Sequence, residues 1–242
     1  MNINISIEAR MTSSRLPGKV LKKINNIPNL ELMIHRVKKV KSVNTIIVAT
    51  TTNKEDDIIV NWCLNNNINY FRGSEDNVYD RVLNAHQEFQ TDIIVELTGD
   101  CPLIDPILIE GAISIYKKNK YDYVSNCLEN GYPLGMAIQV YSLQTLQSIS
   151  LNRELEYQDK EHVTPYLYTT GKYRIFNITP NENHFMPELS VTLDTIEDFY
   201  VIENIVKAFP SIDFTLEDII IFAKNNPQLT NMNMNTHRKG LN

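Results

Sequence analysis

The chain has 242 residues, of which 43% are hydrophobic and 21% charged, as in an average globular protein. It contains no apolar run of the length that spans a membrane, and its first residues lack the basic and apolar segments of a signal peptide. We therefore expect a cytoplasmic protein with no membrane partner. The net charge of −6 argues against a nucleic-acid partner but is compatible with a small anion bound in a local basic pocket.

The first half of the chain alternates short apolar segments with amphipathic segments. The apolar segments have the composition of buried strands and comprise Ile3–Ile7, Thr45–Ala49, Asn69–Phe71 and Asp92–Leu97. The amphipathic segments predict helices that contain Leu30–Val37, Lys54–Leu64, Val78–His86 and Pro106–Tyr116. This alternation predicts a parallel sheet with right-handed crossovers, whose ligands bind beyond the carboxyl ends of the strands. The loops of greatest interest are therefore Glu8–Gly18, Thr50–Asn53 and Thr98–Asp105.

The second half of the chain is less regular. We predict strands at Tyr121–Asn126 and Ala137–Tyr141, and helices at Leu155–Thr169, Ile196–Phe209 and Leu216–Asn225. No repeat, linker or change of composition divides the chain. We therefore expect one α/β domain over residues 1–225, with an extension at about residues 125–180. Residues 226–242 are polar and rich in asparagine, and we expect them to form a tail.

The most informative segment is the loop Ala9–Lys19, ARMTSSRLPGK, which follows the first predicted strand. It places three cations and three hydroxyl groups close together in an otherwise acidic chain, and this composition suits a polyphosphate. It is not a Walker A loop, because Ser13 stands where that motif needs a glycine and Val20 where it needs a hydroxyl. A solvated basic loop is the alternative that composition alone leaves open.

This loop resembles the signature loop of the cytidylyltransferases that make CMP-activated acidic sugars. The resemblance is strongest to the spore-coat-polysaccharide branch, which is related to the CMP-Kdo and CMP-acylneuraminate synthetases. Further segments resemble the later motifs of the family in the same order, namely Phe71–Arg81, Thr98–Pro106, Glu161–Pro165 and Val191–Asp198. The resemblance extends over roughly residues 3–207.

The resemblance implies a fold and a reaction. The fold is a nucleotide-binding α/β fold like that of the nucleotide-diphospho-sugar transferases. It has a mostly parallel twisted sheet sandwiched by helices and a small extension for dimerisation. The reaction joins the CMP part of CTP to a small anionic acceptor, a sugar acid, and releases pyrophosphate for the synthesis of a surface polysaccharide such as lipopolysaccharide. Mg²⁺ is the implied cofactor and a homodimer the implied assembly. Two alternatives stay open: nucleotidyl transfer to a sugar phosphate or another phosphorylated small molecule, and a non-catalytic nucleotide-binding relative.

The resemblance also implies roles for individual residues. The catalytic candidates are Arg10, Lys19 and Asp100, and the metal-binding candidates are Asp100 and Asp194. The nucleotide-binding candidates are Ala9, Arg10, Ser14, Arg15, Lys19, Thr50, Arg72, Asp76 and Arg81. The acceptor-binding candidates are Gln139, Glu161 and His162.

Several candidates have a structural alternative. The alternatives are a salt bridge for Arg15, a helix cap for Asp76 and Asp194, a solvated helix face for Arg81, and a core position for His162. For Asp105 and Asp198 we expect helix capping rather than a place in the site.

The sequence departs from the pattern of this branch at four positions. Glu8 stands where glutamine is usual, and near a triphosphate it needs a cationic partner, for which Arg15 is the candidate. Ala137, Gln139 and Ser190 stand where relatives often carry Asp, Glu and Arg. These three positions lie where an acceptor would bind, so we expect them to alter the choice of acceptor rather than the chemistry.

Overall fold

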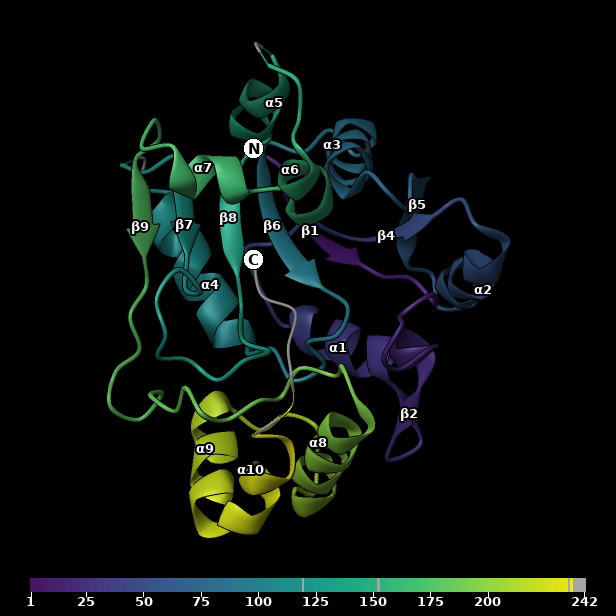
Figure 1. Ribbon diagram of the computed structural model, residues 1–242, viewed down its shortest axis with the longest axis vertical. Coiled ribbons are helices and arrows are strands. Elements are labelled where there is room, and N and C mark those ends of the chain that lie inside the picture. Colours follow the sequence, from purple (N-terminus) through teal and green to yellow (C-terminus); the bar gives the residue numbers. More distant parts are fainter. Residues whose placement is uncertain (119, 152, 235, 237–242) are drawn as a thin grey trace.

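The computed structural model describes residues 1–118, 120–151, 153–234 and 236. Within these residues, seven strands form one sheet in the order β5-β4-β1-β6-β8-β7-β9 (Figure 1). The strands are β1 (Ile3–Glu8), β4 (Thr45–Thr51), β5 (Asn69–Gly73), β6 (Ile93–Thr98), β7 (Tyr123–Ser125), β8 (Gln139–Ser142) and β9 (Ile175–Asn177). Strand β8 is antiparallel to both of its neighbours, and the other adjacent pairs are parallel. The mostly parallel sheet expected from the first half of the chain is therefore confirmed.

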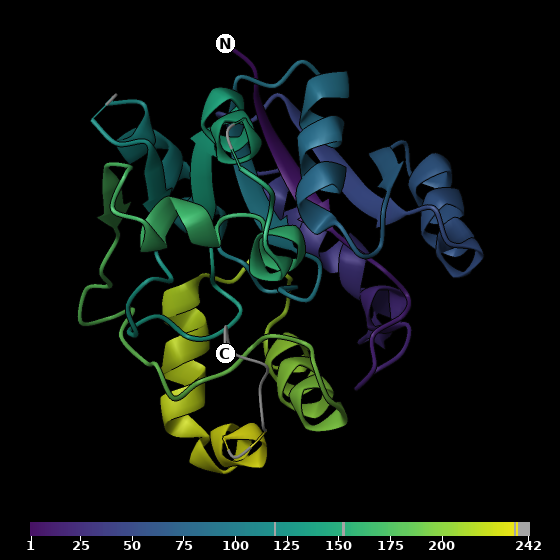
Figure 2. The ribbon, with the colours of Figure 1, turned by 45° about the horizontal axis from the view of Figure 1, so that its top comes forward.

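Helices cover both faces of this sheet, which is why its strands carry β-branched residues with little polar alternation. On one face, Ile94 of β6 and Tyr141 of β8 pack in a buried cluster with residues of α3 (Val78–Glu88), α5 (Leu143–Ser150) and α7 (Pro165–Thr169). On the other face, Ile93 and Val95 belong to a larger cluster. Its helices are α1 (Asn29–Val37), α2 (Asp57–Asn65), α4 (Pro106–Tyr116), α8 (Ile196–Ala208) and α9 (Leu216–Asn225). In both views, α8, α9 and α10 (Pro227–Asn233) lie together at the end of the molecule opposite α3 and α5 (Figures 1 and 2).

The second half differs from the sequence prediction in its helices. The predicted helix Leu155–Thr169 is two short ones, α6 (Tyr157–His162) and α7. The break is at Val163, whose φ of 65° lies in the left-handed region, and Pro165 then starts the next helix without an amide proton to donate. Helix α5 and strand β9 were not predicted; they are short, with eight and three residues.

Two further elements depart from expectation. A hairpin of β2 (Lys23–Ile24) and β3 (Ile27–Pro28) follows a 3₁₀ turn at Lys19–Leu21. The polar tail expected from residue 226 onwards begins instead with α10. The Asn233 amide is buried and donates to the Ser190 carbonyl and the Asp198 carboxylate, at 3.1 and 2.7 Å. The tail beyond Thr236 lies outside the described residues. No helix in the described part of the chain combines the length and apolar character needed to cross a bilayer.

Candidate active site

Two adjoining cavities open at the carboxyl ends of β1 and β6. The first cavity has a volume of about 500 Å³ and the second a volume of about 470 Å³. The first is lined by these predicted site residues: Ala9, Arg10, Ser14, Arg15, Lys19, Asp76, Arg81, Asp100, Glu161, His162 and Asp194. The second is lined by Gln139 and shares Glu8, Thr98, Glu161 and His162 with the first. The fold thus gathers segments from both halves of the chain at the sheet edge where the sequence predicts a ligand.

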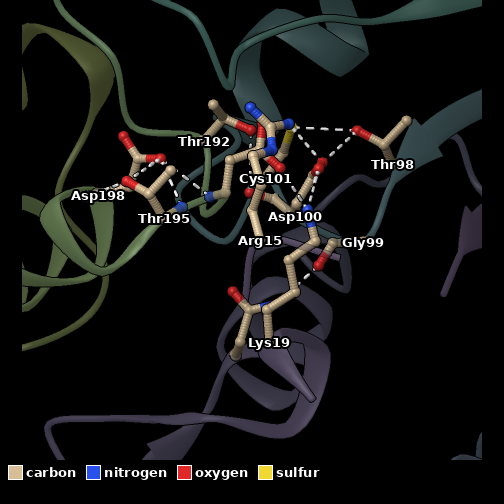
Figure 3. A network of polar contacts seen from close by, with 11 residues as sticks. Arg15, Lys19, Thr98, Gly99, Asp100, Cys101, Thr192, Thr195 and Asp198 are labelled. Atoms are coloured by element: carbon tan, nitrogen blue, oxygen red, sulfur yellow. Dashed lines mark hydrogen bonds and ion pairs between the residues drawn. The ribbon is translucent and has the colours of Figure 1, made fainter. Parts of the chain in front are cut away.

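Lys19 lines the first cavity and reaches Asp100 with the end of its side chain (Figure 3). Its Nζ atom is 2.8 Å from Asp100 Oδ2 and 2.6 Å from Asp194 Oδ1. The Arg15 guanidinium lies 3.0 Å from the other Asp194 oxygen, so the alternative of a salt bridge is realised for Arg15 in this structure. Backbone geometry brings the two carboxylates together, because the Leu193 amide donates to the Asp100 carbonyl at 2.7 Å.

Two glycines permit this arrangement. Gly18, immediately before Lys19, has a φ of 72°, a left-handed conformation that other residues adopt only with strain. A Cβ atom at Gly99 would lie 2.7 Å from the Glu8 carbonyl, so only glycine lets the end of β6 approach the end of β1 this closely. The Gly99 carbonyl also accepts from the Asn29 amide at 2.7 Å, which ties the start of α1 to the site.

Lys19 and Asp100 stabilise each other in their charged forms. Burial alone would raise the pKa of Asp100. The Lys19 charge and the hydrogen bonds from Lys19, Thr98 and Cys101 outweigh burial and hold this pKa below its usual range. Burial would likewise lower the pKa of Lys19, but Asp100 and Asp194 raise it overall. Lys19 and Asp100 are therefore both charged near neutral pH, and an entering phosphate would compete with the carboxylates for Lys19.

Glu75 holds the loop after β1 in place. Its carboxylate accepts hydrogen bonds from Arg10 at 3.1 Å, from Thr12 at 2.5 Å, and from Asn53. The hydrogen bond from Thr12 is the main reason why the pKa of Glu75 is lowered. Sequence reasoning did not single out Glu75, although it lies within a quoted motif, because its partners come from two other loops.

Arg81 is buried rather than solvated. It is 3% exposed, lines the first cavity, and donates to the Ser74 carbonyl, while its Nε atom has no hydrogen-bond partner among the described residues. This excludes the solvated-face alternative. Asp76 also lines the cavity, whereas the cap of α3 is Asn77, whose side chain accepts from the Asp80 amide.

Two nucleotide-binding candidates lie outside both cavities. The Thr50 side chain is fully buried within β4. Arg72 donates to the Thr51 and Asn53 carbonyls, each at 2.8 Å, and pairs with Asp57 at 2.7 Å. Arg72 therefore braces the turn after β4 in this structure.

Helix capping separates Asp194 from Asp198. Thr195 and Asp198 form a capping box at the start of α8, so the cap role expected for Asp198 is confirmed. Asp194 precedes this box and contacts Lys19 and Arg15 instead. Asp105 caps α4 by accepting from the Ile107 amide at 2.7 Å, also as expected.

His162 lines both cavities, and its side chain is 39% exposed, so the alternative of a core histidine is wrong.

Glu8 contacts a second carboxyl group in the wall of the second cavity. Burial raises the pKa of Glu8 to about 7, the nearby Arg81 charge opposes this, and its carboxyl group is hydrogen-bonded to that of Glu96. The pKa of Glu96 lies well above its usual value, because of burial and then because of Glu8. Arg81, rather than the expected Arg15, is thus the cation that acts on Glu8. Glu96 was missed because it lies in the middle of an apolar strand segment.

The donor set can be compared with what Mg²⁺ requires. Among the described residues, no group of three or more His, Cys, Asp or Glu side chains is arranged to hold a metal ion. Asp100 and Asp194 nevertheless converge on one point, and Mg²⁺ usually takes only one or two carboxylates together with water and substrate phosphates. Their oxygen chemistry therefore fits Mg²⁺ bound together with a phosphate.

Comparisons with known proteins identify the family and the fold. The profile of a family described as cytidylyltransferase matches residues 5–229. The chain is 39% identical to the uncharacterized protein MJ1063 of Methanocaldococcus jannaschii, over 96% of this chain and 95% of that one. It is 33% identical to the spore coat polysaccharide biosynthesis protein SpsF of Bacillus subtilis, over 91% and 93% of the two chains.

A third relative and a solved structure extend this comparison. The 8-amino-3,8-dideoxy-manno-octulosonate cytidylyltransferase of Shewanella amazonensis is 28% identical, over 90% of this chain and 96% of its own. The structure of a cytidylyltransferase from Leptospira borgpetersenii superposes with a TM-score of 0.90 at 32% identity, covering 99% of this chain and 100% of that one. The α/β fold implied by the loop motif is thereby confirmed.

Proposed function

Because the chain belongs to the cytidylyltransferase family, we propose that it transfers the cytidylyl group of CTP to a sugar acid and releases pyrophosphate. The observation that carries this proposal is the contact of Lys19 with Asp100 and Asp194 in the first cavity, which adjoins the second. The first cavity has the cations for a triphosphate, and the second has room for an acceptor. By the name of the SpsF relative, the product serves surface polysaccharide synthesis. Since CTP is supplied in the cytoplasm, we propose that compartment.

Binding of CTP exchanges one set of anions for another. Lys19, Arg15 and Arg10 contact Asp100, Asp194 and Glu75, and these contacts keep the cations oriented toward the first cavity. The oxygens of a triphosphate take over the donors that these carboxylates occupy. The cations thus need little reorganisation when the nucleotide binds, which is the condition for strong electrostatic stabilisation.

The reaction is an in-line displacement at the α-phosphorus. An acceptor hydroxyl oxygen, approaching from the second cavity, forms the new oxygen–phosphorus bond while the bond to the β-phosphate oxygen breaks. Pyrophosphate leaves with the electron pair, and the hydroxyl proton is released. Lys19 donates hydrogen bonds to the phosphate oxygens on which negative charge increases, and the cavity walls fix the approach direction. We propose that Asp100 and Asp194 hold Mg²⁺, which neutralises phosphate charge when bound.

The test is pyrophosphate release with Mg²⁺ and each of CTP, UTP, ATP and GTP, combined with a panel of 3-deoxyulosonic acids and sugar phosphates. We expect turnover with CTP and a 3-deoxyulosonic acid. Lys19→Met should lower kcat/KM by about 10³-fold, as loss of a main electrostatic group does. Lys23→Met, which removes an exposed lysine of the adjacent hairpin, is the matched control and should leave kcat/KM unchanged. Turnover only with sugar phosphates would refute the sugar-acid assignment, and no nucleotide binding would refute the function.

We further propose that the chain acts as a homodimer joined through residues 125–180. Exposed apolar side chains occur in this segment, with Leu151 72%, Tyr157 75% and Ile175 41% exposed. Tyr157 also lines the first cavity, so a partner that packs there would complete the site. Light scattering of the wild type should give the mass of a dimer, and Leu151→Glu should give an inactive or weakened monomer. A fully active monomer would refute this assembly.

A further inference from the structure

The second cavity differs from the first in its charge. Among the described residues that line it, the charged or titratable groups are three glutamates, two tyrosines, a cysteine and His162, and no lysine or arginine is present. The Arg81 charge acts on Glu8, but Arg81 lines the first cavity and not the second. A carboxylate or phosphate group could therefore find cations in the first cavity but not in the second.

Three adjacent strands build the wall of this cavity. In the sheet register, Glu96 of β6 stands opposite Ser6 of β1 and opposite Gln139 of β8, and Glu8 lies two residues further along β1. The alternation of side chains therefore places Glu8, Glu96 and Gln139 on one face of the sheet. Glu96 is 2% exposed, so its carboxyl group is fixed by the fold rather than by solvent.

A hydrogen-bond network sets the polarity of this wall. Tyr123 donates to Gln139 Oε1 at 2.6 Å and Thr164 donates to the same oxygen, so the amide must present its NH₂ group to Glu96, at 3.2 Å. Tyr141 donates to the second Glu96 oxygen. The Glu96 oxygens are thus satisfied by neighbouring side chains.

The Glu8 side chain is half-buried and lines both cavities, so it can meet a ligand there. Its Oε1 atom is buried and has no hydrogen-bond partner among the described residues apart from the facing Glu96 carboxyl group. Burial raises the pKa of both acids, and the two carboxyl groups face each other, so the fully ionised form of the pair is disfavoured. Such a wall accepts a hydrogen bond from a ligand and opposes a second anion.

Resting on the proposed function, we infer that the acceptor places a hydrogen-bond donor, a hydroxyl or ammonium group of its polyol chain, against the Glu8–Glu96 pair. The anionic group of the acceptor then stays on the side of the first cavity, beside the cations. An acceptor that carries a phosphate at the far end of its chain is rejected, because that phosphate would lie beside two acids without a cation. An amino group at the same end gains a charge-assisted hydrogen bond.

Three acceptors that differ at one position test this inference. They are 3-deoxy-manno-octulosonate, its 8-amino-8-deoxy form and its 8-phosphate, each titrated by calorimetry into the protein saturated with α,β-methylene-CTP and Mg²⁺. We expect the amine to bind most tightly, the hydroxyl compound next, and the phosphate at least about 100-fold more weakly than the amine, since opposed like charges cost several kcal/mol. Equal binding of phosphate and amine, or no binding of any of the three, would overturn the inference.

Variants then connect this order to particular side chains. Glu96→Gln should reduce the preference for the amine over the hydroxyl by about tenfold without changing the affinity for the CTP analogue, because Glu96 lines only the second cavity. Cys127→Arg, at an exposed position in the wall, adds a cation and should restore binding of the phosphate. Glu129→Gln, an exposed neighbour outside both cavities, is the control.

The variants also allow the inference to be refuted independently of the proposed reaction. If both Glu96→Gln and Cys127→Arg keep the wild-type binding order of the three acceptors, this wall does not select the acceptor. Cys127→Arg alone still tests the inference if Glu96→Gln does not fold. Pyrophosphate release is measured in parallel. If the acceptors bind in the expected order but no pyrophosphate is released, the transfer reaction is refuted and the inference stands. If pyrophosphate is released as fast with the phosphate-bearing acceptor as with the amine, the transfer reaction stands and the inference is refuted.

Discussion

Replacing Asp100 by asparagine should have opposite effects on nucleotide affinity and on turnover. The Asp100 carboxylate contacts Lys19 at 2.8 Å, and its side chain is 23% exposed. A unit charge about 4 Å from a phosphate contributes about 4 kcal/mol at an effective dielectric constant of about 20. Partial exposure and the Lys19 charge reduce this repulsion to about 1–2 kcal/mol. Without divalent cations, Asp100→Asn should therefore bind CTP roughly 5–30-fold more tightly than the wild type.

Turnover should move the other way, because the amide is a poor ligand for Mg²⁺. We expect kcat to fall by about 10²–10³-fold, the usual effect of removing one preorganised electrostatic group. Affinity is measured by calorimetry in EDTA, and turnover by pyrophosphate release with Mg²⁺. Asp122→Asn, which breaks a surface ion pair with Arg174 at 2.8 Å, is the matched control for loss of one charge. Weaker CTP binding in EDTA together with unchanged kcat would refute the assignment of Asp100 to the reacting centre.

Three further predictions concern stability. Glu8 has a pKa raised to about 7 from 4.5, so its own contribution to the free energy of unfolding should fall by roughly 3 kcal/mol as the pH rises from 4.5 through 7. Glu8→Gln should make this slope smaller in urea titrations, and the remainder comes from Glu96, whose pKa is raised as well. Burial lowers the pKa of His86 from 6.5 to about 3, so the free energy of unfolding should fall by roughly 2 kcal/mol as the pH is lowered from 6.5 to 5. A free energy of unfolding that stays constant over this range would contradict the prediction. Thr195→Ala should lower the free energy of unfolding by about 1 kcal/mol through loss of the α8 cap, whereas Thr170→Ala, at an exposed position, should not.

The sequence predicts the parallel half of the fold well. Its strands and helices are separate, strongly patterned segments, and both faces of the strands are buried, so apolar runs mark them directly. The second half is predicted less well. The sequences of α6 and α7 together have the pattern of one helix, and the break at Val163 comes from its left-handed backbone conformation, which the pattern does not reveal. Helix α10 has a polar sequence, and its position depends on Asn233 contacting Ser190 and Asp198, which are remote in sequence.

Some site residues can likewise be predicted from the sequence and others cannot. The loop that contains Arg10 and Lys19 could be singled out because its charge and hydroxyl content are local properties. Arg72 has the residue type of a phosphate ligand, yet its position at the strand end directs it to the Thr51 and Asn53 carbonyls. Glu75 accepts its hydrogen bonds from residues of two other loops, and the sequence around Glu75 does not predict these contacts.

What the sequence determined by itself was the class of fold and the loop for which we propose nucleotide binding, because both depend on residues that are neighbours along the chain. Only the tertiary structure decided which charges meet. Lys19, Asp100 and Asp194 are brought together from distant segments by strand order and by the bond from Leu193 to Asp100. The pairing of Glu8 with Glu96 follows from strand register, and burial then raises the pKa of both acids.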